Sequence, residues 1–156
     1  MRTPASRVAV ALGSNVGDRR AHLDFAIGRL RATLGGVKVS SLIETAPEGV
    51  GAQPTYLNGV LVGMSREHPR GLLERLQAIE HERGRERPFS GAPRTLDLDL
   101  ILWGGAVLDE PGLSVPHPRF RERRFVLAPL AEIAPEMVDP VTGLTVADLL
   151  ARLPGP

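Results

Sequence analysis

The stretch from Arg94 to Trp103 constrains the fold of this chain more than any other part of the sequence. Its apolar and polar residues alternate with the two-residue period of a β-strand. Asp97 and Asp99 therefore share one face of the expected strand, about 7 Å apart along the backbone, while leucines face the other way. Two oxygen ligands at this spacing suit magnesium, which completes its shell with water and substrate phosphates. The alternative is a strand that carries acids only because that face is wet.

The composition is that of one globular domain covering residues 1–156. The chain is 42% hydrophobic and 24% charged, with a net charge of +1. No apolar run approaches the roughly 20 residues that span a bilayer, and no signal-peptide core is recognisable. We therefore expect a cytoplasmic protein without a membrane partner. Cysteine is absent and the four histidines lack zinc-binding spacing, which excludes disulfides and thiolate chemistry and makes oxygen the expected metal ligand.

Arginines gather on both sides of the acidic strand. Every basic residue except Lys38 is an arginine, and the two clusters comprise Arg83, Arg85, Arg87 and Arg94 before the strand, and Arg119, Arg121, Arg123 and Arg124 after it. The planar guanidinium group suits bidentate contacts to phosphate oxygens. The sequence thus favours a phosphate-containing ligand.

Hydrophobic periodicity predicts the order strand, helix, strand, strand, helix, strand. The expected strands are 7–13, 37–44, 59–64 and 94–103, and the expected helices are 18–34 and 69–83. This order is the ferredoxin-like βαββαβ pattern. We therefore expect an α+β fold with a four-stranded antiparallel sheet, helices on one face and the other face free for ligands. Helices over 126–133 and from residue 145 are expected as C-terminal additions.

Three connecting segments offer weaker signals. The turn 13–18 contains glycines but neither phosphate-loop fingerprint, so a structural turn is the simpler interpretation. Tyr56 and Asn58 point to the same side of an extended segment, which suits a flat heteroaromatic ligand, although a core tyrosine and a turn asparagine are the commoner explanation. The segment 85–93 has the composition of a lid over a site.

Several motifs coincide in one family. They are Ala11-Leu-Gly-Ser-Asn15, Gln53-Pro-Thr-Tyr-Leu-Asn58, Ile79-Glu80 with Gly84-Arg85, Pro93-Arg-Thr-Leu-Asp-Leu-Asp99, Val115-Pro-His117, and Arg123 with Phe125 and Pro129-Leu130. In this order they closely resemble the 6-hydroxymethyl-7,8-dihydropterin pyrophosphokinases, folate-pathway enzymes with a ferredoxin-like core. The resemblance implies transfer of pyrophosphate from ATP to the pterin hydroxymethyl group, which yields AMP and the pterin diphosphate.

The resemblance also implies the roles of individual residues. The implied ligands of two Mg²⁺ ions are Asp97 and Asp99. The implied pterin site comprises Thr45, Tyr56, Asn58 and Phe125. The implied ATP contacts are Gln77, Arg87, Arg94, Ser114, His117 and Arg123, and the implied catalytic residues are Arg85, Arg94 and Asp97. The partners are then two small-molecule substrates, ATP and the pterin, and we expect a monomer that binds no nucleic acid.

A ferredoxin-like nucleic-acid-binding module without catalysis is the alternative from another class. Such a module needs exposed aromatic residues on its sheet, whereas this chain is 4% aromatic and its candidate face displays two acids. An ATP-dependent transferase with another acceptor and a binding subunit whose site has decayed are two further alternatives. Pterin-dependent release of AMP from ATP distinguishes the pyrophosphokinase from all three.

Overall fold

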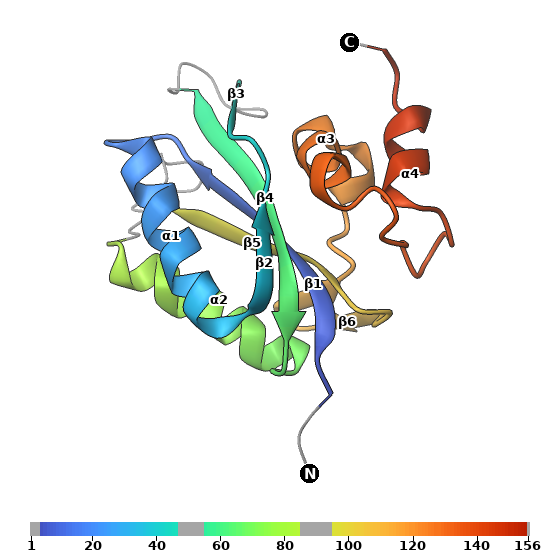
Figure 1. Cartoon of the computed structure of the whole chain (residues 1–156), viewed down its shortest axis with the longest axis horizontal. Coiled ribbons are helices and arrows are strands. Elements are labelled where there is room, and N and C mark those ends of the chain that lie inside the picture. Colours follow the sequence, from blue (N-terminus) through green and yellow to red (C-terminus); the bar gives the residue numbers. More distant parts are fainter. Residues whose placement is uncertain (1–3, 47–54, 85–94, 156) are drawn as a thin grey trace.

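An antiparallel sheet organises the chain in the computed structural model, which describes residues 4–46, 55–84 and 95–155 (Figure 1). Its strands are β1 (Ser6–Ser14), β2 (Gly35–Val39), β3 (Ile43–Thr45), β4 (Tyr56–Ser65) and β5 (Asp97–Trp103). The hydrogen-bonded order is β2-β4-β1-β5, and β3 also pairs with β4. β1 therefore lies between β4 and β5, and β5, which carries the two acids, is at the edge.

Two helices cover one face of this sheet, in the predicted order along the chain. α1 (Arg19–Thr33) connects β1 to β2, and α2 (Pro69–Glu82) connects β4 to β5 (Figure 1). Asp18 caps α1 by accepting a hydrogen bond from the Ala21 amide at 3.1 Å. Pro69 begins α2, where its missing N–H would have had no partner in the helix. Leucines of both helices pack on the leucine and valine face of β1 and β5.

The second predicted strand, 37–44, is wrong as a continuous element, because the structure divides it into β2 and β3. At the break, the Ser40 hydroxyl accepts a hydrogen bond from the Val60 amide at 2.9 Å, so a side chain replaces a backbone acceptor. The Leu42 side chain then lies over Gly59, where a Cβ would come within 2.6 Å of the Leu42 Cδ2 atom. A glycine in β4 thus makes room for the irregular step between β2 and β3.

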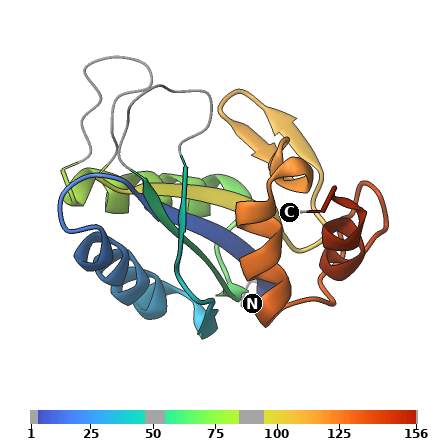
Figure 2. The same ribbon diagram turned by 90° about the horizontal axis from the view of Figure 1, so that it is seen from above.

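The expectation that helices cover one face and leave the other free is wrong for the apolar end of the second face. α3 (Arg124–Ile133) and α4 (Val146–Arg152) lie on that side of the sheet (Figures 1 and 2). With the 3₁₀ turn η1 (Phe120–Glu122), they bury Ala9, Val60 and Ile101 in a second core. Helices cover this part of the second face because an apolar sheet face must be buried against another layer.

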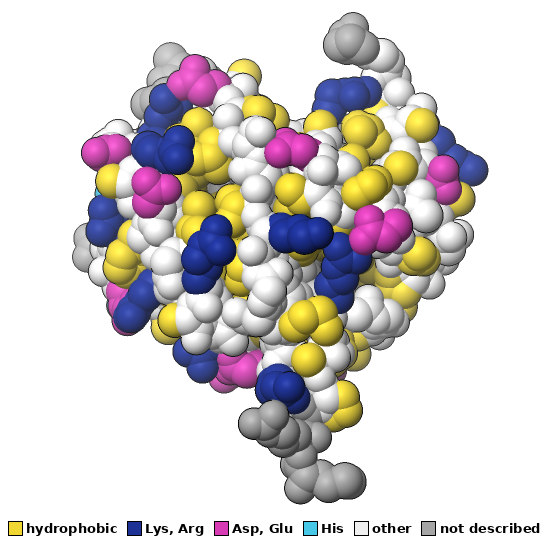
Figure 3. Space-filling view, in the orientation of Figure 1, with side chains coloured by type: hydrophobic (Ala, Val, Ile, Leu, Met, Phe, Trp, Pro, Cys, Tyr) yellow, Lys and Arg dark blue, Asp and Glu magenta, His cyan; other side chains and the backbone are white. Residues whose placement is uncertain are grey.

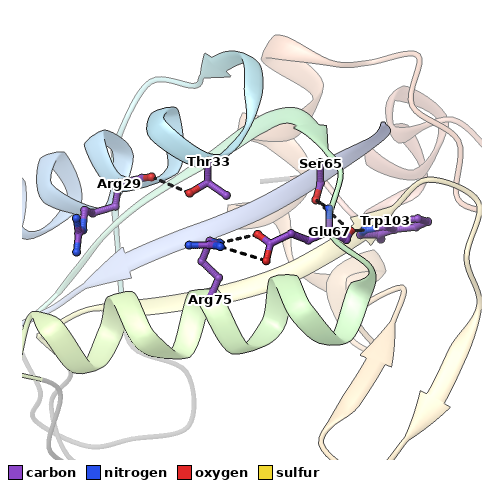
Figure 4. A network of polar contacts seen from close by, with 6 residues as sticks. All are labelled: Arg29, Thr33, Ser65, Glu67, Arg75 and Trp103. Carbon is purple, nitrogen blue, oxygen red and sulfur yellow. Dashed lines mark hydrogen bonds and ion pairs between the residues drawn. The ribbon is translucent and has the colours of Figure 1, made fainter. Parts of the chain in front are cut away.

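The end of the sheet furthest from Asp97 is closed by contacts around Glu67. The Trp103 indole N–H donates to the Glu67 carbonyl at 3.0 Å, and the Arg75 Nε atom lies 2.5 Å from the Glu67 carboxylate (Figure 4). A hairpin of β6 (Leu108–Glu110) and β7 (Leu113–Val115) follows β5. In the three described stretches, no helix has both the length and the apolar character needed to span a membrane.

A buried carboxylate, Asp139, holds the segment between α3 and α4. It accepts hydrogen bonds from the Arg121 guanidinium, with Nε–Oδ2 at 2.5 Å and Nη2–Oδ1 at 3.0 Å, and from Thr142 and the Val141 amide. Burial alone raises the pKa of this carboxyl. The hydrogen bonds, together with the charge of Arg121, outweigh burial, and the pKa falls from 3.8 to about 2.

We expect Asp139 to make the stability of the fold sensitive to acid. Because its pKa is lower in the folded state, its stabilisation is complete above the unfolded value of 3.8 and is lost as the pH falls through about 2. The shift corresponds to about 2 kcal/mol of unfolding free energy. Asp139→Asn should therefore lower that free energy at neutral pH and flatten its dependence on acid. Denaturant titrations at a series of pH values measure both, with exposed Asp24→Asn as the control. An unchanged acid dependence in Asp139→Asn would contradict this expectation.

Candidate functional site

The register of β1 with its neighbours brings the candidate residues to one face of the sheet. Gly13 pairs with Asn58 of β4 and with Asp97 of β5, and Ala11 pairs with Asp99. Directly opposed residues of antiparallel strands project from the same face, and two strand spacings amount to about 10 Å. Asn58 and both acids therefore share the face that α3 covers further along the sheet.

Gly13 leaves the space that two of these side chains occupy. A Cβ at this position would lie 2.9 Å from the Asn58 Oδ1 atom and 3.4 Å from the Tyr56 Cδ1 atom. The first distance is shorter than any ordinary contact, so a larger residue would displace the Asn58 amide. The sequence alone favours a structural turn around Gly13 and does not reveal this role, although a glycine that ends an otherwise apolar strand is a signal of close approach.

Thr45, Tyr56 and Asn58 come together where β3 meets β4. Thr45 pairs with Tyr56, and the Asn58 side-chain amide donates a hydrogen bond to the Thr45 hydroxyl. Asn58 is buried, whereas Tyr56 and Thr45 are partly exposed. The structure thus gathers three of the four residues for which the resemblance implies pterin contact. The fourth, Phe125, is partly buried at the beginning of α3, and the guanidinium carbon of Arg123 lies 5.5 Å from its ring centroid.

A buried glutamate of α2 fixes the strand that carries the acids. Glu80 is 4% exposed, and its Oε2 atom accepts a hydrogen bond from the Leu98 amide at 2.7 Å. Leu98 lies between Asp97 and Asp99, so this bond anchors the backbone from which both acids project. Sequence reasoning places Glu80 only within a motif and misses this contact. The signal was available, because a glutamate on the apolar stripe of a helix is buried and needs a hydrogen-bond donor.

A backbone hydrogen bond holds His117 beside β5, and a second hydrogen bond orients its ring. Its amide donates to the Ile101 carbonyl at 2.9 Å, which fixes the segment after β7 against β5. Its Nδ1 atom accepts a hydrogen bond from the Arg119 amide at 3.2 Å, so the Nε2 atom carries the proton of a neutral ring. A ring oriented in this way can donate to an anionic oxygen.

Two other expected nucleotide contacts, Ser114 and Gln77, lie on the β6–β7 hairpin and on α2. Ser114 of β7 donates to the Asp109 carboxylate at 3.3 Å within the hairpin, and Gln77 lies on the exposed side of α2, whose buried side contacts β5. The remaining expected residues, Arg85, Arg87 and Arg94, lie outside the described residues together with the candidate lid 85–93.

A neutral histidine, His22 of α1, contacts Arg83, the residue that follows α2. Arg83 donates from Nε to the His22 Nδ1 atom at 2.8 Å, and its guanidinium carbon lies 4.9 Å from the Phe25 ring centroid. Burial, and then the positive charge of Arg83, lower the pKa of His22 below 6.5, against opposing contributions from Asp18 and a backbone hydrogen bond. The ring therefore remains a hydrogen-bond acceptor at neutral pH and helps to fix the end of α2.

Asp97 and Asp99 fit the chemistry of a magnesium ion shared with a substrate. Both are partly exposed carboxylates on one face of β5. Over residues 4–46, 55–84 and 95–155, no group of three or more His, Cys, Asp or Glu side chains could hold a metal by itself. Magnesium usually takes one or two carboxylates and completes its shell with water and substrate phosphates. The aspartate pair therefore suits an ion that arrives with a phosphorylated substrate.

Comparison with known proteins gives concordant matches. A model of the 7,8-dihydro-6-hydroxymethylpterin-pyrophosphokinase family matches residues 9–135. The 2-amino-4-hydroxy-6-hydroxymethyldihydropteridine pyrophosphokinase of Pseudomonas aeruginosa is 44% identical over 151 residues, which cover 95% of this chain and 92% of that protein. The Bacillus subtilis protein of the same name is 45% identical over 130 residues, covering 82% of this chain and 78% of that protein.

Some relatives are much longer. The folic acid synthesis protein fol1 of Pneumocystis carinii is 38% identical over 149 residues, and the match covers 94% of this chain but only 20% of that protein. The crystal structure of wild-type Plasmodium falciparum HPPK-DHPS with pteroate superposes with a TM-score of 0.77 at 14% identity, covering 97% of this chain and 43% of that one. The structural match supports the fold alone.

These matches define the class as a pyrophosphokinase of folate biosynthesis. The chain belongs to the 7,8-dihydro-6-hydroxymethylpterin-pyrophosphokinase family. The predicted resemblance and the expectation of an enzyme are thereby confirmed, and the nucleic-acid-binding alternative gains no support. On the one face shown in Figure 3, basic and acidic side chains are interspersed.

Two glycine substitutions test the role of Gly13. Gly13→Ala should lower the free energy of unfolding by about 1–3 kcal/mol, because the added methyl group meets the buried Asn58 amide. A Cβ added at Gly28, in the middle of α1, would meet no heavy atom within 4 Å, so Gly28→Ala should raise the same free energy by about 0.5–1 kcal/mol. Denaturant unfolding measures both changes. A Gly13→Ala variant as stable as the wild type would show that the Asn58 position is not constrained in this way.

Proposed function

We propose that this chain transfers the β,γ-pyrophosphoryl group of ATP to the hydroxymethyl oxygen of 6-hydroxymethyl-7,8-dihydropterin. The bond between that oxygen and the β-phosphorus forms, the bond from the β-phosphorus to the bridging oxygen of the α-phosphate breaks, and AMP leaves. The observation that carries the proposal is the pairing of Gly13 with both Asn58 and Asp97, in a chain that matches the family over residues 9–135. It puts a candidate acceptor site and a candidate phosphate site on one face.

The acceptor site consists of side chains that suit a flat, hydrogen-bonding ring. Tyr56 and Phe125 supply aromatic surfaces, and Thr45 and Asn58 supply polar groups at its edge. The hydrogen bond from Asn58 to Thr45 fixes the orientation of the amide before the ring arrives. A preorganised amide loses little freedom on binding, so this arrangement favours affinity and a defined orientation of the hydroxymethyl group.

The phosphate site is centred on Asp97 and Asp99. These residues would hold Mg²⁺, in the proposal two ions, and the metal supplies neutralisation of phosphate charge and orientation of the triphosphate. Asp97 also orients the hydroxymethyl group and helps to take up its proton. Phosphoryl transfer asks mainly for positioning and charge stabilisation, which is consistent with a site built from fixed side chains on strands.

Cationic and polar side chains complete the nucleotide site. His117 donates from Nε2 to a phosphate oxygen, and Arg123 adds a positive charge at the beginning of α3. Gln77 and Ser114 contribute to nucleotide binding from α2 and β7. Three further arginines, Arg85, Arg87 and Arg94, are proposed from the sequence resemblance alone, with Arg85 and Arg94 stabilising the charge on the transferred group.

The proposal also covers the fold type, the domain organisation, the oligomeric state and the cellular location. The strand order β2-β4-β1-β5 with two helical crossovers supports a ferredoxin-like core to which α3 and α4 are C-terminal additions. We propose that residues 1–156 act as one catalytic domain, as a monomer in the cytoplasm. The coverage of the Pseudomonas aeruginosa relative supports a domain that works by itself, although in fol1 the matching region is a fifth of the chain.

The decisive experiment measures nucleotide products from ATP and Mg²⁺ with and without 6-hydroxymethyl-7,8-dihydropterin. We expect AMP, formed in equal amounts with the pterin diphosphate, and no ADP. Formation of ADP would indicate an ordinary kinase. MgATP binding without pterin binding would favour a transferase with another acceptor, and absence of any product would favour a decayed site.

Substitution of either acid tests the phosphate site. Asp97→Ala and Asp99→Ala should each lower turnover by about 10³-fold or more, because each removes an oxygen ligand of the Mg²⁺ that would neutralise the transferring phosphates. The melting temperature should stay close to that of the wild type, since both side chains are partly exposed. Asp24→Asn on the exposed side of α1 is the matched control. Near-normal turnover in either alanine variant would remove that residue from the metal site.

A further inference from the structure

Arg19, the first residue of α1, bridges the two strands that carry the candidate pterin-contact residues. Its Nη1 atom donates to both the carbonyl oxygen and the hydroxyl of Thr55, each at 3.0 Å, and its Nη2 atom forms an ion pair with Glu44. Glu44 belongs to β3, and Thr55 directly precedes β4. One guanidinium group thus holds three acceptors on two segments of the chain.

The residues that Arg19 holds are the immediate sequence neighbours of candidate pterin-contact residues. Glu44 precedes Thr45, and Thr55 precedes Tyr56. Successive residues of a strand project to opposite faces, so the side chains of Glu44 and Thr45 lie on opposite sides of β3. Arg19 reaches Glu44 from α1, the helix that packs on the leucine and valine face of the sheet. Its influence on the acceptor face must therefore pass through the strands.

β3 is the element that depends most on such a bridge. It has three residues, β4 is its one partner strand within the described part of the chain, and its Ile43 is 36% exposed. A strand of this length has few contacts of its own. An exposed ion pair by itself contributes little, but the Arg19 side chain is only 28% exposed and its planar fork satisfies three oxygen atoms at once. The bridge therefore adds fixed geometry where backbone pairing is short.

We propose that Arg19 is a positioning residue for the pterin site. By holding β3 against the beginning of β4, it keeps the Thr45 hydroxyl within hydrogen-bond distance of the Asn58 amide and keeps Tyr56 in register with Thr45. Arg19 touches neither substrate in this proposal. The inference rests on the proposed function, because it takes these three side chains as the pterin contacts.

Kinetics of Arg19→Ala, beside Arg20→Ala as the matched control, test the proposal. Arg20 is the next residue of α1, and among the described residues it pairs along the helix, with Asp24 at 3.2 Å. Arg19→Ala should raise the KM for the pterin on the order of tenfold, the size of a lost set of charge-assisted hydrogen bonds, with the KM for MgATP unchanged. Arg19→Lys should fall between, since an ammonium group cannot present the same fork. Arg20→Ala should behave as the wild type.

The single tyrosine of the chain gives a readout without turnover. With 3-fluorotyrosine incorporated, the protein has one ¹⁹F resonance, which reports on Tyr56 in the absence of substrates. Arg19→Ala should shift or broaden this resonance and Arg20→Ala should not. Glu44→Gln, which weakens the ion pair but leaves the Thr55 contacts, should change it in the same direction by a smaller amount.

The outcomes separate this proposal from the proposed function. If the wild type releases pterin-dependent AMP and Arg19→Ala matches Arg20→Ala in pterin KM and in the ¹⁹F signal, Arg19 does not position the site. Equal losses of pterin and MgATP affinity would also overturn the proposal, because a general loss of structure would then explain them. If the wild type itself forms no AMP with pterin, the proposed function fails, and a ¹⁹F change in Arg19→Ala would still show that Arg19 holds the strands.

Discussion

The pairing of β1 with both β4 and β5 is the constraint on which the candidate site depends. Because β1 lies between these strands, its register decides which residue of β4 stands across from which residue of β5. Gly13 pairs with Asn58 on one side and with Asp97 on the other, so the register places these two residues on either side of β1. Because Gly13 has no side chain, the space above it is open to the Asn58 amide. A shift of one residue in either pairing would turn one set of side chains to the opposite face.

The two helical layers protect this register from different sides. α1 and α2 bury the leucine and valine face, which favours one alternation of β5 over the other. α3 and α4 bury the apolar end of the second face and stop before the acids. The same sheet face is thus a core at one end and a candidate site at the other, and the boundary falls between Val60 and Asn58 in β4.

Much of this arrangement could be predicted from the sequence. The alternation around Asp97 and Asp99 predicts the strand and its two faces, and the periodicity of 69–83 predicts α2 closely. The shared side of Tyr56 and Asn58 follows from the two-residue period. These predictions succeed because they depend on local patterns, which the burial of each face reinforces.

The remaining features depend on tertiary contacts that local sequence patterns do not contain. The break between β2 and β3 arises from the Ser40 hydroxyl and from Leu42 lying over Gly59, and Arg19 offered no pattern at all, because its partners come from two other segments.

The contact of Glu80 with the Leu98 amide has a consequence for association between molecules. β5 is at the edge of the sheet, and an exposed edge strand offers free amides on which a strand of another chain can add. Near the beginning of β5, the Leu98 amide is already bonded to a buried carboxylate of the same chain. An incoming strand would have to break this bond and displace a buried glutamate, so Glu80 also protects the edge against sheet extension and aggregation.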